Sequence, residues 1–282
     1  MCERKNQLEK TWDMEDIVKP GMVSKLKKIR HVVLDVDGTI CCGNKLYETT
    51  MPFFNILASL GITFSFLTNN SSKSVADHMR NLSAMGLNLE KKHLYTSVLF
   101  MADYLKARFP GIKKVFVLGT ESMKCELGGL GFDIVSSFPD AVIVGYDTEL
   151  SYEKLCRAAY WLSQGAVFMS THPDRFCPTN IPEFIAIDCG WITDLLQQVT
   201  IKQSIVLGKP SSEMLVYALK KYRLKPEESA VAGDRYNTDM KMALNAGAFS
   251  VHISRQSSGC LPVPDITSPD LLVFGHILEK VR

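Results

Sequence analysis

The chain has 282 residues, of which 46% are apolar and 22% charged, a profile that excludes an intrinsically disordered protein. This length exceeds that of one typical domain, so two domains are expected. A formal net charge of only +2 gives no field that indicates a nucleic-acid or membrane surface, and the basic stretch 25–30 is best explained as a solvated helix face. No apolar run is long enough to span a membrane, and the first ten residues are charged where a signal peptide needs an apolar stretch, so we expect a cytoplasmic protein.

The eight cysteines form no C-x-x-C pair and no zinc-binding spacing, so reduced thiols are expected. The adjacent pair Cys41 and Cys42 is the one unusual arrangement. It is explained either by two small apolar fillers near a loop or by a redox pair.

Residues 1–30 are predicted to form an appended helical arm that is broken at Pro20-Gly21. From residue 31 onward, strand-like apolar runs alternate with segments of helical period, which is typical of β-α-β units and a parallel sheet. The predicted strands are nearly continuous apolar runs, as expected for strands that are buried on both faces; they are 32–36, 62–67, 205–207 and 230–232. Helices are predicted at 51–60 and 75–85, each followed by a glycine at a C-cap position, Gly61 and Gly86.

Residues 111–203 repeat this alternation on their own, with strands predicted at 115–118, 141–144, 166–169 and 184–187 and a helix at 152–162. None of these strands ends in a convergent set of carboxylates. We therefore predict an α/β fold with a core domain formed by 31–110 and 204–282, and a second α/β domain, 111–203, inserted into it.

Four polar clusters follow the four predicted core strands: 35–39, 68–72, 208–210 and 233–239. In an open parallel sheet the ligand site lies beyond the carboxyl ends of the strands, so the four clusters are expected to meet. Their carboxylates, one hydroxyl and one ammonium can together hold a divalent cation and a phosphate and offer an oxygen nucleophile. The sequence therefore predicts phosphoryl chemistry.

Each cluster taken alone has a simpler explanation. Asp37-Gly38 after a strand is an ordinary hairpin-turn signal. The second carboxylate, at Asp35, favours a functional site instead. Two acids at the end of a buried strand repel each other and raise the pKa of one of them, which costs free energy that a metal ion or a reaction would justify. Thr68 fits a helix N-cap or a Ser/Thr turn, and a helix N-terminus at 73–75 is also compatible with anion binding. Lys209 alone is usually a solvated lysine, and the loop from Asp234 to Asp239 could be a polar turn. Tyr236 occupies a ligand position of an EF-hand calcium loop, so that motif does not fit. Pro210 follows Lys209 where a Walker A loop has Ser or Thr, so that motif does not fit either.

The four motifs Asp35-Val36-Asp37-Gly38-Thr39, Thr68-Asn69-Asn70-Ser71, Gly208-Lys209-Pro210 and Gly233-Asp234-Arg235-Tyr236-Asn237-Thr238-Asp239 occur in this order. Together they resemble the motifs of the haloacid dehalogenase-like (HAD) phosphatases, in particular the NagD-like, para-nitrophenylphosphatase branch. The resemblance covers about residues 31–255. It implies a Rossmann-like core with a parallel sheet and an inserted α/β cap of the type called C2.

The resemblance also implies roles for individual residues. Asp35 would be the nucleophile and Asp37 the general acid and base, while Thr68, the backbone of Asn69, and Lys209 would bind phosphate. Magnesium would be held by the Asp35 carboxylate, the Asp37 backbone carbonyl and Asp234, with Asp239 ordering the site. The cap segment 171–174 resembles the substrate-facing loop of the family, so Asp174 and the neighbouring Arg175 are expected to bind substrate.

The expected activity is magnesium-dependent hydrolysis of a small phosphate ester through an aspartyl-phosphate. A receiver domain, which also phosphorylates an aspartate, fits less well because it needs about half this length. A phosphomutase of the same fold remains open. Sugar phosphates, nucleotides, phosphoglycolate and pyridoxal phosphate all fit as substrates, no nucleic-acid or membrane partner is expected, and a homodimer is possible.

Overall fold

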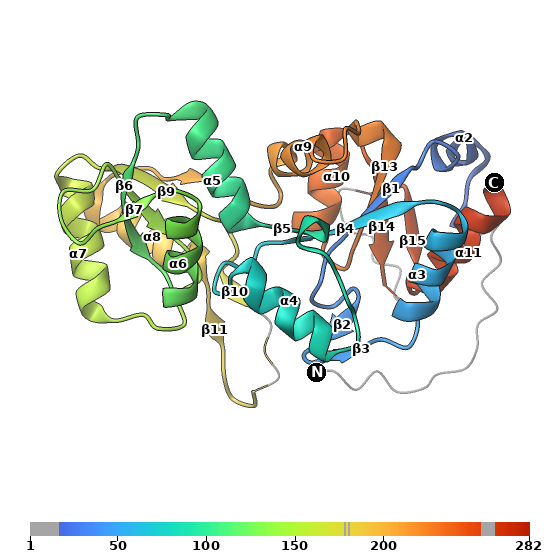
Figure 1. Ribbon diagram of the computed structural model, residues 1–282, viewed down its shortest axis with the longest axis horizontal. Coiled ribbons are helices and arrows are strands. Elements are labelled where there is room, and N and C mark those ends of the chain that lie inside the picture. Colours follow the sequence, from blue (N-terminus) through green and yellow to red (C-terminus); the bar gives the residue numbers. More distant parts are fainter. Residues whose placement is uncertain (1–16, 178, 180, 255–262) are drawn as a thin grey trace. The chain divides into compact units, whose positions relative to one another are not determined.

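The computed structural model describes residues 17–177, 179, 181–254 and 263–282. It is an α/β protein whose chain divides into two compact units (Figure 1). Unit 1 is formed by the described residues up to Leu67, by Lys92–Leu94 and by the described residues from Pro210 onward. Unit 2 is formed by Thr68–Lys91 and Tyr95–Lys209.

The sheet of unit 1 has six strands in the order β15-β14-β13-β1-β4-β5. Their bounds are β1 (His31–Leu34), β4 (Thr63–Thr68), β5 (Leu94–Thr96), β13 (Ser229–Gly233), β14 (Phe249–Ile253) and β15 (Ile266–Ser268). β1 pairs in parallel with both β13 and β4, so β1 lies in the interior of the sheet. Every residue of β1, β13 and β14 is buried, as a parallel sheet with both faces covered requires.

Short helices and one hairpin complete unit 1. They are η1 (Pro20–Met22), α2 (Val23–Leu26), the hairpin strands β2 (Cys41–Cys42) and β3 (Lys45–Leu46), α3 (Thr50–Ser59), η2 (Lys91–His93), α9 (Ser212–Lys220), η3 (Pro226–Glu228), the π-helix η4 (Tyr236–Met240), α10 (Lys241–Ala246) and α11 (Leu271–Val281). α3 and α11 pack against each other (Figure 1). The ring centroids of Phe53 on α3 and Phe274 on α11 are 5.9 Å apart.

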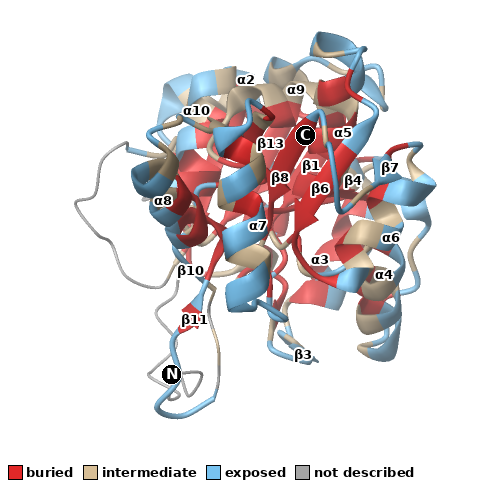
Figure 2. Cartoon of the chain, turned by 90° about the vertical axis from the view of Figure 1, so that its left-hand side faces the viewer, coloured by how far each residue is buried: buried red, intermediate tan, exposed pale blue. Residues whose placement is uncertain are grey.

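The sheet of unit 2 has five strands in the order β12-β9-β8-β6-β7. The elements are α4 (Val75–Ala84), α5 (Ser97–Arg108), β6 (Lys114–Leu118), α6 (Glu121–Gly129), β7 (Asp133–Ile134), β8 (Ala141–Val144), α7 (Tyr152–Ser163), β9 (Val167–Ser170), the hairpin strands β10 (Phe176–Cys177) and β11 (Ala186–Ile187), α8 (Cys189–Thr200) and β12 (Ile205–Val206). α7 and α8 bury an apolar core against β6, β8 and β9 that includes Phe116, Val142, Phe168, Ile192 and Leu196. Figure 2 shows the buried strands inside and the exposed outer faces of the helices.

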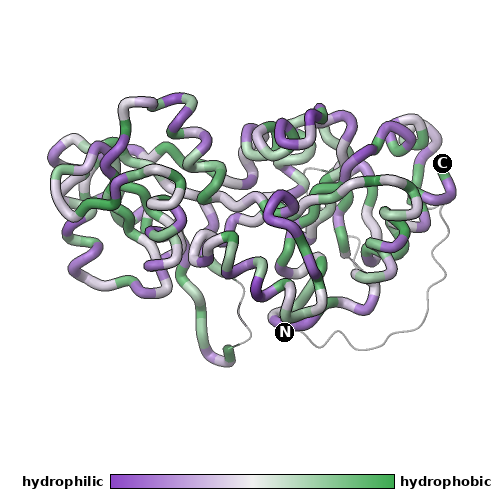
Figure 3. The backbone as a smooth tube through the Cα atoms, viewed as in Figure 1, coloured by the Kyte–Doolittle hydropathy of each residue, from purple (hydrophilic) through white to green (hydrophobic). Residues whose placement is uncertain are grey.

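The hydropathy pattern that predicted these elements is visible in the folded chain. In Figure 3 the hydrophobic stretches of backbone lie in the interior strands of each unit, and hydrophilic stretches lie in outer helices and loops. The predicted C-cap glycines Gly61 and Gly86 have φ of 64° and 94°, a left-handed conformation that favours glycine. No helix in the described part of the chain is long and apolar enough to cross a membrane.

Two predictions about the elements were wrong. The strand before Gly208 was expected in the core sheet, but β12 pairs with β9 in the sheet of unit 2. The strand expected at 184–187 is only Ala186–Ile187, and it pairs with β10 in a hairpin. Near Pro20-Gly21 the chain is not helical at residues 18 and 19, and Pro20 begins η1, because a proline is favourable in a first helical turn where its missing N–H is not needed. The rest of the predicted arm, residues 1–16, lies outside the described residues.

The boundaries 31–110, 111–203 and 204–282 stay a prediction. The expectation of reduced thiols is met at the free cysteines of the described residues, which are Cys41, Cys125, Cys156, Cys177 and Cys189. It is wrong at Cys42, which is disulfide-bonded.

Candidate active site

Three carboxylates gather at the carboxyl end of the interior strands of unit 1. Asp35 directly follows β1, and Asp234 and Asp239 follow β13, the parallel neighbour of β1. One carboxylate oxygen from each residue lies within 4.8 Å of the other two. Asp35 and Asp239 are buried, and Asp234 is partly buried. Three anionic groups this close repel one another, and a bound divalent cation with a preference for hard oxygen ligands would offset that repulsion.

Two glycines let these carboxylates lie against the backbone. Gly38 has φ of 87°, and a Cβ there would lie 2.3 Å from Oδ2 of Asp234. A Cβ on Gly233 would lie 2.4 Å from Cγ of Asp239. A side chain at either position would therefore push a carboxylate out of the cluster. The site is built for close packing of acidic groups, which fits a small, hard cation such as Mg²⁺.

Asp37, the second acid of this motif, has different surroundings from Asp35. β1 ends at Leu34, and the backbone N–H of Asp35 still donates to the carbonyl of Ala232 at 3.0 Å. The chain then turns, with Gly38 N–H donating to Cys41 O at 2.9 Å, and Asp37 is exposed while Asp35 is buried. Its side chain is not among the three clustered carboxylates of the described residues. An exposed carboxyl beside a buried one is suited to proton exchange with solvent.

The segment 234–239, which taken alone could be a polar turn, is largely helical. η4 is a π-helix, a rare form that is frequent at functional sites, and it places Asp239 in the carboxylate cluster, so this residue is in direct reach of a cation. The site also contains His252 of β14, whose Nε2–H donates to the carbonyl of Asp234 at 3.1 Å. Burial lowers the pKa of His252, so the ring is neutral and acts as a donor that holds the backbone. No pattern along the sequence pointed to this residue.

In unit 2, the loop 68–72 is held by side chains of three helices or their caps. Ser97 Oγ donates to Asn69 O at 2.8 Å, His78 Nε2–H donates to Asn70 O at 3.2 Å, and Thr120 Oγ1 donates to Ser72 O at 2.8 Å. Burial lowers the pKa of His78 to about 4, so this donor is neutral at physiological pH. The loop is therefore rigidly positioned by residues that the motif itself does not include.

The first N–H groups of the helix near this loop have side-chain partners. Ser74 is the N-cap of α4, its Oγ accepting the Asp77 N–H, and Val75 N–H donates to Glu126 Oε1 at 2.8 Å. These N–H groups are therefore occupied by side chains, and anion binding at this helix N-terminus stays a prediction. Thr68 is not the cap, but the Ser/Thr-turn interpretation is confirmed, since its Oγ1 accepts the Asn70 N–H at 3.1 Å.

Lys209 and Asn69, both expected to bind phosphate, lie together in unit 2. Lys209 is buried, with 3% of its surface exposed, and so is Asn69. The Asn69 side chain forms hydrogen bonds with the Lys209 backbone and with the carboxylate of Asp174. A buried lysine at this end of a strand is unusual, because an ammonium is costly to desolvate, and it indicates a functional group.

The two residues expected to bind substrate from the loop 171–175 have different surroundings. Asp174 accepts from Asn69, and its Oδ2 lies 3.7 Å from Nδ1 of the buried His172. Arg175 is exposed, pairs with Asp194 at 2.9 Å, and stacks over the Trp191 ring at 4.6 Å. Only Asp174 therefore lies with Asn69 and Lys209.

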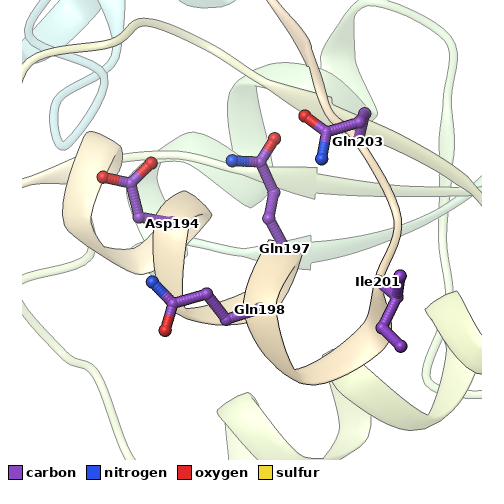
Figure 4. Close-up of a pocket in the computed structure, with 5 residues that line it drawn as sticks. All are labelled: Asp194, Gln197, Gln198, Ile201 and Gln203. Atoms are coloured by element: carbon purple, nitrogen blue, oxygen red, sulfur yellow. The ribbon is translucent and has the colours of Figure 1, made fainter.

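A separate pocket of about 350 Å³ lies at the end of α8 and contains none of the predicted site residues. Figure 4 shows its lining, which is Asp194, Gln197, Gln198, Ile201 and Gln203. Amide side chains predominate, and its one carboxylate already pairs with Arg175. It offers no nucleophile and no convergent positive charge for a phosphate.

Comparison with known proteins gives one consistent family. A haloacid dehalogenase-like hydrolase model matches residues 32–133, and a second HAD-hydrolase-like model matches residues 206–259. The 4-nitrophenylphosphatase of Thermotoga maritima is 30% identical with a TM-score of 0.84, over 89% of this chain and 98% of that chain. NagD of Escherichia coli K-12 is 26% identical with a TM-score of 0.78, over 86% of this chain and 97% of that chain. The acid sugar phosphatase of Staphylococcus aureus is 29% identical over 257 residues, 91% of this chain and 98% of that protein.

The fold, the carboxylate cluster and these matches define the class: the chain belongs to the haloacid dehalogenase-like hydrolases. Within that family it is a NagD-like phosphatase. The resemblance drawn from the four motifs is confirmed.

Proposed function

We propose that this phosphatase hydrolyses small phosphate monoesters, with Mg²⁺, through an aspartyl-phosphate on Asp35. The observation that carries the proposal is the cluster of Asp35, Asp234 and Asp239 at the end of β1 and β13. The names of the matched relatives, an acid sugar phosphatase and a 4-nitrophenylphosphatase, support a small ester as substrate. They also favour hydrolysis over the receiver and phosphomutase alternatives.

In the first step, a carboxylate oxygen of Asp35 attacks phosphorus and the bond from phosphorus to the ester oxygen breaks. Asp37 in its acid form gives a proton to the departing oxygen. In the second step, Asp37 takes a proton from a water molecule that attacks the phosphorus of the aspartyl-phosphate. This releases phosphate and restores the Asp35 carboxylate.

Asp35, Asp234 and the backbone carbonyl of Asp37 would hold Mg²⁺, which when bound supplies positive charge near the phosphoryl oxygens. We assign Asp239 to ordering this site, and its position in the cluster makes a further ligand oxygen available. Thr68, the backbone N–H of Asn69 and the Lys209 ammonium would bind the phosphoryl oxygens. For Arg175, the exposed residue that ends the loop 171–175, we propose an influence on substrate choice.

Substitution of the nucleophile tests the mechanism. Asp35→Asn should lower kcat for para-nitrophenyl phosphate by at least about 10⁴-fold, because an amide cannot form the aspartyl-phosphate. Thermal unfolding should show that the variant still folds, since the shape is almost unchanged. Retention of more than a few per cent of activity in a freshly purified sample would refute the role of Asp35.

Metal removal tests the cation. Treatment with EDTA should abolish hydrolysis and added Mg²⁺ should restore it, while Ca²⁺ should not, because its larger coordination shell disfavours the single-oxygen geometry that attack by Asp35 needs. Steady-state rates with each ion check this. Full activity after exhaustive chelation would contradict the metal role.

A further inference from the structure

The side chain of Asn69 holds the backbone of Lys209 at two points. Asn69 Oδ1 accepts the Lys209 N–H at 2.8 Å, and Asn69 Nδ2 donates to the Lys209 carbonyl at 3.0 Å. One amide side chain therefore satisfies both backbone groups of a residue 140 positions away in the sequence. Such a pair of bonds fixes the plane and the direction of the Lys209 backbone, as a neighbouring strand would.

Asp174 fixes which way the Asn69 amide points. The same Nδ2 group donates its second hydrogen to Asp174 Oδ2 at 3.0 Å. A flipped amide would place its oxygen against the Lys209 carbonyl and the Asp174 carboxylate, and its NH₂ against the Lys209 N–H. All three contacts would then be repulsive, so the observed orientation is the only one that satisfies them.

The residues on either side of Lys209 make its backbone dependent on this contact. Gly208 has φ of 72°, and a Cβ there would lie 2.8 Å from Asn69 Oδ1 and 2.6 Å from the carbonyl of Thr171. Gly208 thus allows the close approach that the two hydrogen bonds require. Pro210 on the other side restricts Lys209 to extended backbone angles.

We propose that the side chain of Asn69 is a positioning residue for Lys209, and that Asp174 acts through Asn69 by orienting its amide instead of touching the substrate. This rests on the proposed function, in which the Lys209 ammonium binds the phosphoryl group. The side-chain role is separate from the phosphate binding expected of the Asn69 backbone N–H, which every substitution except proline retains. Because Lys209 is buried, its ammonium has few ways to recover its place if the backbone shifts.

The first experiment replaces the Asn69 amide, which clamps the Lys209 backbone through its two hydrogen bonds, by a carboxylate of the same shape. In Asn69→Asp, a carboxylate oxygen faces the Lys209 carbonyl and the Asp174 carboxylate, so the clamp should open. We expect kcat/KM for para-nitrophenyl phosphate to fall on the order of 100-fold, mainly in kcat, because a misplaced lysine loses transition-state stabilisation. Inorganic phosphate, used as a competitive inhibitor, should also bind more weakly.

A second substitution separates positioning from a general structural effect. In the double variant Asn69→Asp/Asp174→Asn, the amide at position 174 can donate to the carboxylate at position 69, and that carboxylate can still accept the Lys209 N–H. The double variant should recover about tenfold of the lost kcat/KM. Asp174→Asn alone keeps an oxygen that accepts from Asn69, so it should lose less kcat/KM than Asn69→Asp.

Asn70→Asp is the matched control for the added charge. Asn70 Oδ1 accepts from the Ser72 N–H and from its hydroxyl, and a carboxylate accepts both equally well. This variant should lose far less activity than Asn69→Asp. Melting temperatures of all variants identify those that fold.

If Asn69→Asp does not fold, Asp174→Ala provides the test. It removes the carboxylate that accepts from the Asn69 amide but keeps Asn69 itself, so it should lower kcat without changing the rank of substrates.

The outcomes are distinguishable. Unchanged kinetics in a folded Asn69→Asp, or no recovery in a folded double variant, would overturn the inference. A shift of substrate ranking in Asp174→Asn would overturn the role of Asp174 and favour direct substrate contact. Loss of the proposed function itself would appear instead as absence of magnesium-dependent hydrolysis in the unchanged protein or as an active Asp35→Asn variant.

Discussion

At the scale of single residues, the acidic cluster depends on the absence of side chains as much as on the acids. Gly38 serves the site twice, since its φ of 87° turns the chain away from β1 and its missing Cβ leaves room for Asp234. A D-G pair after a strand is a common turn signal. Only the packing of Asp234 on Gly38 distinguishes this turn from an ordinary one.

Gly38→Ala should therefore disable the site. A Cβ 2.3 Å from Asp234 Oδ2 must displace that carboxylate, so Mg²⁺ affinity and kcat/KM should each fall by at least about tenfold. Isothermal titration with Mg²⁺ measures the affinity, and steady-state rates measure kcat/KM.

Gly61→Ala is the matched control. The φ of 64° at this position imposes similar backbone strain, but no atom lies within 4 Å of the new Cβ. This variant should lose about 1 kcal/mol of stability and keep its activity. Equal loss of Mg²⁺ affinity in both variants would contradict this account.

At the scale of elements, α4 shows how a helix end can be stabilised within unit 2. Ser74 and Asp77 form a capping box, and Ser122 of α6 accepts the Ser74 N–H at 2.9 Å and donates to the Asp77 carboxylate. The hydrogen bonds from Ser122 and then from Ser74 hold the pKa of Asp77 below its ordinary value of 3.8. The sequence predicted where α4 begins, but not that α6 would complete its cap.

Ser122→Ala should lower the free energy of unfolding by roughly 1 kcal/mol at pH 7. A carboxyl whose pKa is depressed on folding stabilises the protein above its ordinary pKa and loses that contribution as pH falls through the folded value. The difference between the variant and the unchanged protein should therefore narrow as pH falls below about 4. Urea unfolding at several pH values measures this difference in the free energy of unfolding. Ser83→Ala, at an exposed position of α4, is the control. A difference independent of pH would mean that Ser122 does not act through Asp77.

At the scale of the whole molecule, each unit buries a neutral histidine. In unit 1, His31 of β1 contacts Thr63 Oγ1 at 2.7 Å and Ser65 Oγ at 2.8 Å, and burial, followed by the charge of His93, lowers its pKa to about 4. In unit 2, burial lowers the pKa of His78 to about 4. Neither ring takes up a proton in the folded state until the pH is well below 6.5, the ordinary value.

Mild acid should therefore destabilise the protein. Between pH 6.5 and 4 the unfolded histidines bind protons that the folded ones do not, so stability is complete above 6.5 and falls as the pH decreases. Each histidine should contribute about 2 kcal/mol to this loss by pH 5. Urea unfolding at pH 7 and at pH 5 measures the loss of unfolding free energy between the two pH values. His31→Gln should remove the part of this loss that His31 contributes, even though the variant is also less stable at pH 7. An unchanged pH dependence in that variant would contradict the assignment.

The sequence by itself determined the parallel sheet and the order of its polar clusters. The continuous apolar runs that became β1, β4 and β13 and the glycines after α3 and α4 are local signals, because burial on both faces and positive φ each select residue types directly. The position of Asp35 and Asp234 in the cluster also follows from the sequence, because neighbouring parallel strands place the residues that follow them at the same edge of the sheet.

Only the tertiary structure decided which sheet β12 joins, which side chains hold the loop 68–72, and which amide clamps Lys209. A two-residue strand such as β12 has too little pattern to specify its partner, so packing of the whole unit selects β9. The contacts of Asn69 with Lys209 and Asp174 join residues more than 100 positions apart in the chain. No local propensity encodes such contacts, because their hydrogen bonds exist only after distant backbone segments have been brought together and buried.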